Sequence, residues 1–191
     1  MPTHRFKINS CLLASGIFAL IVGLLSGCRP PTPHGDAVAY ADLKSLTEGF
    51  IAANDRSQAG LEKVIQTAEG TDTVFLAHTN WAAELASFQA YDLAHPMLRG
   101  QYRVDSTISG NRTRVRYRAT KPELVLQEAV FVREGSRPIW FRLSDSTDNI
   151  MYRSNKTLSL HLDSGVYRID VEQRSWLFRE LEEHIQGAVR R

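Results

Sequence analysis

The stretch YRVDSTISGNRTRVRYRA, residues 102–119, decides the fold because its side chains alternate between apolar and polar types with a period of two. The alternating positions lie on both sides of the turn at 109–111 and are Tyr102, Val104, Ile108, Thr113, Val115, Tyr117 and Ala119. Two such runs joined by a short glycine-containing turn are typical of a β-hairpin. The stretch therefore predicts two antiparallel strands.

Strand patterns continue from this hairpin towards the C-terminus. Apolar segments occur at 124–132, 139–143, 158–162 and 167–171, with a short one around 151–152, and turns at 134–136 and 163–165 separate two pairs of them. Such connections are too short for the crossovers of a parallel sheet. Residues 100–174 therefore predict an antiparallel meander of about seven strands.

Residues 37–95 have helical spacing instead, and so do residues 176–189. The first region predicts three helices, which begin at Asp36, Ser57 and Asp72 and end at Asn54-Asp55, at Gly70 and before Pro96. In the second region every fourth position is apolar, which predicts a closing amphipathic helix; these positions are Leu177, Leu181, Ile185 and Val189.

Helices followed by strands indicate the α+β class. We expect N-terminal helices packed on the antiparallel meander, with a C-terminal helix, in a single domain over residues 37–191. Half-barrel lipid carriers and cone-shaped helix-plus-sheet folds share this order of elements, and the residues do not choose between them.

The N-terminus predicts a secretory signal at residues 1–27. Arg5 and Lys7 precede an apolar run over 11–25, which is shorter than the ~20 residues that a membrane-spanning helix needs. The run ends in Leu25-Ser26-Gly27-Cys28, which resembles the lipobox of bacterial lipoproteins. The resemblance implies that Cys28 carries a diacylglyceryl group and further acyl chains such as palmitate. A plain signal peptide or an N-terminal anchor is the alternative.

The predicted processing defines the mature chain and its location. Residues 28–36 contain three prolines and predict an extended tether. Arg29 stands where an Asp would favour the inner membrane, so we expect the outer membrane facing the periplasm, with the inner membrane and the cell surface as alternatives. Arg5 and Lys7 are two of the 23 basic residues, and the 21 that remain equal the 21 acidic ones. A near-neutral mature chain does not indicate a nucleic-acid partner.

Four arginines in the hairpin form a candidate face for an anionic partner. By alternation Arg112, Arg114, Arg116 and Arg118 share one side of a strand, and guanidinium groups pair well with phosphates and carboxylates. The partner could be a phosphate head group, an acidic glycan or a protein. In the simpler interpretation, which we favour, cross-strand carboxylates neutralise this face; the candidates are Asp105, Glu123, Glu128 and Glu134.

The aromatic residues suggest two further roles. Trp140 alternates with Phe141 and is a candidate exposed aromatic contact on the opposite side of its strand. The other aromatic residues predict either the core or the lining of a ligand cavity between the helices and the sheet; they are Trp81, Phe88, Trp176 and Phe178.

No metal, cofactor or catalytic residue is predicted. His78, Glu84, Asp92 and His95 lack the His-Glu-x-x-His spacing of a metal site, so we expect Glu84 to face solvent. The polar residues 145–149 lack the alternation of a calcium loop and predict a turn. Motifs for a catalytic serine or cysteine and for a phosphate-binding loop do not occur.

Two patterns resemble a group of uncharacterised bacterial envelope lipoproteins. They are Trp81-x-x-Glu84-Leu85-x-x-Phe88-x-x-x-Asp92-x-x-x-Pro96-x-Leu98-x-Gly100-x-Tyr102 and Asn149-x-x-Tyr152-x-Ser154. The resemblance implies a helix-plus-sheet lipoprotein domain and assigns no activity. We expect a membrane-anchored binding or structural module. The alternatives are a carrier or sensor of a lipid or other hydrophobic molecule, and an envelope hydrolase with groups near His78 or His161.

Overall fold

The predicted hairpin at residues 102–119 is present in the computed structural model, which describes residues 41–176 and 180–191. Strand β3 (Tyr102–Ser109) pairs antiparallel with β4 (Arg112–Ala119) in continuous register. Gly110 takes a φ of 58° in the turn between them. That conformation suits glycine because it has no Cβ.

The antiparallel meander is also confirmed. Strands β5 (Leu126–Glu134), β6 (Arg137–Asp148), β7 (Tyr152–His161) and β8 (Val166–Ser175) follow β4, and each pairs with its neighbour in the sequence. Strand β6 is longer than expected, because residues 145–148 continue it instead of forming a polar turn.

The predicted C-terminal helix at 176–189 is wrong. Residues 181–190 form strand β9 (Leu181–Arg190), which pairs antiparallel with β8 and with β1. A spacing of four is a multiple of two, so an apolar residue at every fourth position fits one face of a strand as well as one face of a helix. Gly187 disfavours the helix, because glycine in a helix interior costs about 1 kcal/mol relative to alanine.

Two of the three predicted N-terminal helices are wrong as well. Residues 57–76 form a hairpin of β1 (Gly60–Thr67) and β2 (Gly70–Leu76), and β1 pairs with β9. Residues 102–175 form six strands, β3–β8, rather than about seven, because the short segment around 151–152 is the start of β7. With β1, β2 and β9, the sheet over the described residues has nine strands in the order β2-β1-β9-β8-β7-β6-β5-β4-β3. Val64, Ile65 and the threonines at 67, 71 and 73 are β-branched and favour a strand, and pairing with β9 gives β1 a partner that lies far away in the sequence.

The first helix is present but begins later than expected. Helix α2 (Leu43–Arg56) starts after Asp42, whose carboxylate accepts a 2.9 Å bond from the backbone amide of Ser45. The expected cap Asp36 lies outside the described residues. The region predicted as a third helix contains β2, then α3 (Trp81–Glu84), α4 (Ala86–Gln89) and the 3-10 turn η2 (Pro96–Leu98).

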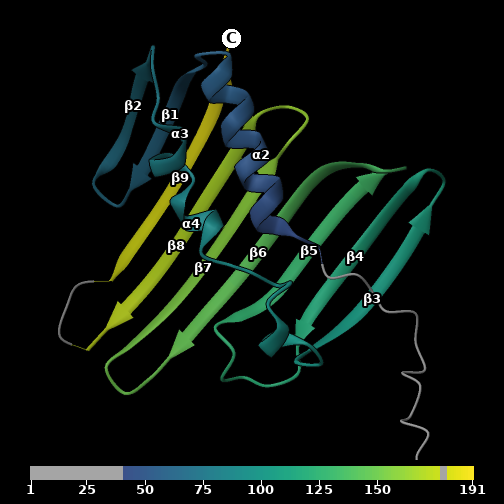
Figure 1. Ribbon diagram of the computed structural model, residues 1–191. Helices are drawn as coiled ribbons and strands as arrows, with labels where there is room; N and C mark the ends of the chain where they lie inside the picture. The colour runs from purple at the N-terminus through teal and green to yellow at the C-terminus, as the bar shows by residue number, and fades with distance from the viewer. Residues whose placement is uncertain (1–40, 177–179) are drawn as a thin grey trace, which may run out of the picture. The chain divides into compact units, whose positions relative to one another are not determined.

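Helices α2, α3 and α4 all lie on one face of the sheet, as Figure 1 shows. We call this the helix-covered face and the other the bare face. The core lies between the helices and the sheet, where the edge of the Phe88 ring packs against Phe141 and Tyr167 at centroid distances of 6.0 and 6.3 Å. Residues 39–191 form one compact unit that contains this whole core.

The ring of Tyr167 in β8 lies directly against the backbone of strand β9. Gly187 lies opposite Tyr167 in the β8–β9 register. A Cβ at Gly187 would lie only 2.0 Å from Cε1 of that ring. The ring of Tyr167 therefore crosses β9 at Gly187, since glycine has no side chain to block it.

We predict that Gly187→Ala destabilises the protein by about 3 kcal/mol or more, because the added methyl overlaps a buried ring. Gly49→Ala is the matched control. Gly49 lies in α2 with open space around its Cβ position, so alanine there should stabilise the helix by about 0.5–1 kcal/mol. Urea denaturation measures both values, and equal midpoints for the two variants would contradict the packing described here.

Candidate functional site

A polar network attaches α3 to the sheet beside Gly187. The Tyr167 hydroxyl donates to the carboxylate of Glu84, and Lys63 Nζ lies 2.7 Å from the same carboxylate. Glu84 and Lys63 are 15% and 21% exposed. The expectation that Glu84 faces solvent is therefore wrong. Burial, followed by the bond to Glu84, raises the pKa of Tyr167, so its phenol stays neutral and donates.

The core beneath this network consists of fully buried apolar side chains. Leu85, Phe88 and Leu160 are 0% exposed and meet between the helices and the central strands. Trp81 is also buried, and its ring nitrogen donates a 3.1 Å bond to the Ala59 carbonyl. Of the aromatic residues considered for a cavity lining, Trp81 and Phe88 are core residues, Trp176 is exposed and Phe178 lies outside the described residues.

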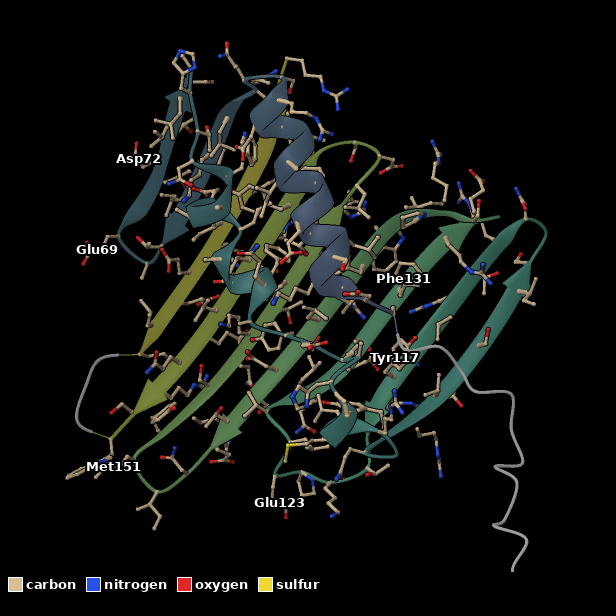
Figure 2. All side chains as sticks on the ribbon, viewed as in Figure 1. Glu69, Asp72, Tyr117, Glu123, Phe131 and Met151 are labelled. Atoms are coloured by element: carbon tan, nitrogen blue, oxygen red, sulfur yellow. The ribbon has the colours of Figure 1, made fainter. Side chains whose placement is uncertain are left out.

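A mostly apolar pocket of about 400 Å³ lies next to this core, where the segment after α4 meets the loop before β5. We call it the Tyr91 pocket. One wall consists of Ala90, Tyr91, Asp92, Leu98 and Tyr102, and the other of residues 123–126. Figure 2 labels Glu123 at this end of the molecule. The volume is within the usual range for small-molecule sites, ~300–1,000 Å³.

The first wall is held in place by the burial of Leu93 and by a hydrogen bond from Tyr91. Leu93 is completely buried in the core, and the Tyr91 hydroxyl donates to the carboxylate of Asp145 on β6. Lys156 on β7 lies 3.8 Å from that carboxylate and 6.0 Å from the centroid of the Tyr91 ring. Burial and then the bond to Asp145 raise the pKa of Tyr91, so the phenol remains a neutral donor.

The second wall is held in place by two hydrogen bonds to its backbone carbonyl groups. The Tyr102 hydroxyl donates a 3.0 Å bond to the Leu126 carbonyl, and the Ser146 amide donates a 2.9 Å bond to the Val125 carbonyl. These bonds leave the side chain of Val125 55% exposed beside the pocket. An exposed apolar side chain at the mouth of an apolar pocket is suited to contact a ligand.

Sequence reasoning missed Tyr91, Asp145 and Lys156 as parts of a site. The sequence pattern predicts Tyr91 near the end of a long helix and Asp145 in a polar turn. The hydroxyl and the carboxylate belong to residues 54 positions apart, and no local pattern indicates that they meet. His95-Pro96 is the local pattern that indicates where the helical segment ends, and the chain turns there within the first wall of the pocket.

The four arginines of the candidate anionic face lie on the bare face of β4. Their neighbours Val115 and Tyr117 point to the core on the other side. Three of the four expected carboxylates contact them: Arg112 Nε lies 3.4 Å from Glu134 and Arg116 Nε lies 3.5 Å from Glu128, while Arg118 pairs with Asp105. The fourth, Glu123, borders the Tyr91 pocket instead.

Trp140 lies on the bare face of β6, opposite to Phe141. The indole is half-buried and stacks on His161, with ring centroids 5.7 Å apart. This stacking leaves less of Trp140 available for a partner than an isolated surface tryptophan would offer.

The histidines within the described residues do not form a recognisable reaction centre. His78 borders a cavity of about 160 Å³ near Asn54 and Asp55, which is smaller than typical ligand sites. Within the part of the chain that the structure describes, no three His, Cys, Asp or Glu side chains group as metal ligands. His184 borders a polar hollow of about 280 Å³ on the bare face, and its bonds to Asp170 and Glu182 raise its pKa.

No protein-family model matches the chain, and no curated protein or solved structure is significantly similar to it. Within residues 41–176 and 180–191, no helix has the length and hydropathy needed to cross a bilayer. Cys28, the lipobox and the tether lie outside the described residues. The site must therefore be interpreted from its own geometry.

We predict that Glu84→Gln lowers the free energy of unfolding by about 1–3 kcal/mol, because it leaves Lys63 partly buried without a counter-charge. Tyr167→Phe should cost about 1 kcal/mol through loss of one hydrogen bond. Glu48→Gln, an exposed change on α2, should stay within ~0.5 kcal/mol of the unmodified protein. A chemical-denaturation series in which Glu84→Gln behaves like Glu48→Gln would show that the network does not stabilise the fold.

Proposed function

We propose that this protein is a lipid-anchored binding module of the bacterial envelope, and that its ligand is a hydrophobic molecule held in the Tyr91 pocket. The observation that supports this proposal is the pocket itself: its lining is mainly apolar, and its polar groups are few and fixed. Such sites bury the apolar body of a ligand and orient it through a small number of polar contacts.

The chemistry of the pocket narrows the class of ligand. Asp92 and Glu123 are among the residues that line the pocket, and their carboxylates disfavour a ligand with a negative group beside them. The interior offers leucine, valine and tyrosine side chains. A neutral acyl chain or another uncharged apolar molecule therefore fits better than a free fatty acid with its carboxylate beside Asp92 and Glu123.

A hydrolase is less well supported. The cavity beside His78 is small, and His161 is stacked on Trp140. Covalent hydrolysis needs a nucleophilic side chain within hydrogen-bond reach of a base, and the contacts given for these two histidines include no such side chain. A ligand-binding role is consistent with the observed groups and requires no bond to be broken.

The proposed anchor is a separate element. Acylation of Cys28 would hold the module at the outer membrane, facing the periplasm, because two or more acyl chains give stable attachment.

We predict that Cys28→Ala abolishes incorporation of labelled palmitate and releases the chain from the envelope membrane fraction. Mass spectrometry of the N-terminal peptide from the unmodified protein should show an acylated cysteine. Cys11→Ala is the control, since Cys11 lies within the predicted signal. Palmitate labelling that survives in Cys28→Ala would contradict the assignment of the anchor.

The ligand proposal is tested by filling the pocket. We predict that the chain from Arg29 onward, which contains the whole compact unit, increases the fluorescence of the neutral apolar dye N-phenylnaphthylamine. Ala90→Trp should reduce the affinity for the dye at least tenfold, because the indole would occupy the pocket that Ala90 lines.

Ala52→Trp provides the matched control for this substitution. Ala52 is exposed on α2 and does not line the pocket, so tryptophan there should leave dye affinity within twofold. Thermal melting checks that both variants fold. Equal affinities for the two folded variants, or no dye binding by the unmodified chain, would refute the proposed function.

A further inference from the structure

We infer that the bare face of β3, β4, β5 and the first half of β6 binds the surface of an anionic phospholipid bilayer. We call this surface the basic face. Its charged residues are Arg103, Arg112, Arg114, Arg116, Arg118, Arg137 and Arg142, with Asp105, Glu128 and Glu134. Seven guanidinium groups against three carboxylates leave an excess of four positive charges.

Two carboxylates of the basic face each contact two arginines, so a net positive charge remains although ion pairs are present. Glu128 lies 3.5 Å from both Arg116 and Arg142. Glu134 likewise contacts Arg112 and Arg137, at 3.4 and 3.5 Å. One carboxylate cannot neutralise two guanidinium groups, so each cluster keeps a net positive charge.

Two arginines of the basic face form no ion pair within the described residues. Arg114 lies between Thr107 and Val132 in the register, and Arg103 lies directly opposite Arg118. Like charges directly opposite each other destabilise a sheet. Asp105 pairs with Arg118 and also lies near enough to Arg103 and Arg116 for their charges to lower its pKa. One carboxylate therefore serves three guanidinium groups here, and a bound anion would compensate the remaining positive charge.

The apolar residues of the basic face are covered by its arginines. Val130 is 0% exposed on a face without helices, and Arg116 and Arg142 flank it in the register. Arginine stems cover apolar surface while their guanidinium groups reach solvent. The side chains of Arg112 and Arg118 are 66% and 49% exposed, so the charged groups are accessible.

The rest of the bare face differs in charge. Its arginines are Arg153, Arg168, Arg174 and Arg190, and its carboxylates are Glu62, Asp148, Asp170, Glu172 and Glu182. Four arginines thus face five carboxylates, and His184, the further basic side chain in the register here, is bonded to two of those carboxylates. The positive excess is confined to one end of the sheet, where β3 is the edge strand.

A bilayer fits this surface better than a protein partner does. Protein interfaces are centred on exposed aromatic or apolar side chains, and Trp140, the one aromatic residue considered for contact, is half-buried on His161. The arginines instead extend over roughly 20 Å along β4 and about 14 Å across the four strands. Clusters of four to eight basic residues are typical of surfaces that bind anionic lipids, and guanidinium pairs with phosphate in a bidentate way.

Cosedimentation with vesicles tests the inference without depending on the Tyr91 pocket or on Cys28. The chain from Arg29 onward should bind vesicles of phosphatidylglycerol and phosphatidylcholine but not vesicles of phosphatidylcholine alone. Raising the salt concentration should release it. The double change Arg103→Gln and Arg114→Gln removes the two unpaired cations and should lower the partition coefficient about 25-fold, at roughly fivefold for each cation.

The matched control is Arg168→Gln with Arg174→Gln. Both residues lie on the bare face of β8, in the part without excess charge, and their loss should change partitioning less than twofold. The inference is overturned if anionic vesicles do not bind, or if the two double variants behave alike. Retention on a polyaspartate resin without vesicle binding would overturn it in favour of an acidic protein partner.

Discussion

The contact between Tyr167 and Gly187 is the constraint on which the rest of the structure depends. The ring can cross β9 only because Gly187 has no side chain. Its hydroxyl then reaches Glu84, which is held by Lys63 from β1. One tyrosine thus connects three strands of the sheet to α3, which lies on the helix-covered face (Figure 1). The segment that follows α4 starts from this fixed point, and it forms the first wall of the Tyr91 pocket.

The two faces of the sheet have separate roles in this account. The helix-covered face holds a solid core and, beside it, an apolar pocket with a few oriented polar groups. The bare face carries a small apolar cluster around Val130 and Trp140 beneath charged side chains, and the excess of positive charge lies at one end. A single antiparallel sheet can support both because its side chains alternate between the faces. An anchored module could therefore lie on anionic head groups through one face while the other remains free to hold its ligand.

The antiparallel meander can be predicted from the sequence because alternating apolar and polar side chains and short turns are local signals. Strand β9 and the β1–β2 hairpin were missed for the opposite reason. Leu181, Ile185 and Val189 satisfy both periods, and only pairing with distant strands decides between them. The grouping of the four arginines followed from alternation alone. Tyr91, Asp145 and Lys156 form their contacts through tertiary structure, so no pattern along the chain could identify them.

Native mass spectrometry of the protein extracted from envelope membranes tests the central claim most directly. The account predicts a fraction of molecules with an additional non-covalent mass of an apolar molecule, which disappears after extraction with organic solvent while the covalent acyl mass remains. Only the acylated chain, with no bound mass before extraction and none after incubation with membrane lipids, would contradict a hydrophobic ligand in the Tyr91 pocket.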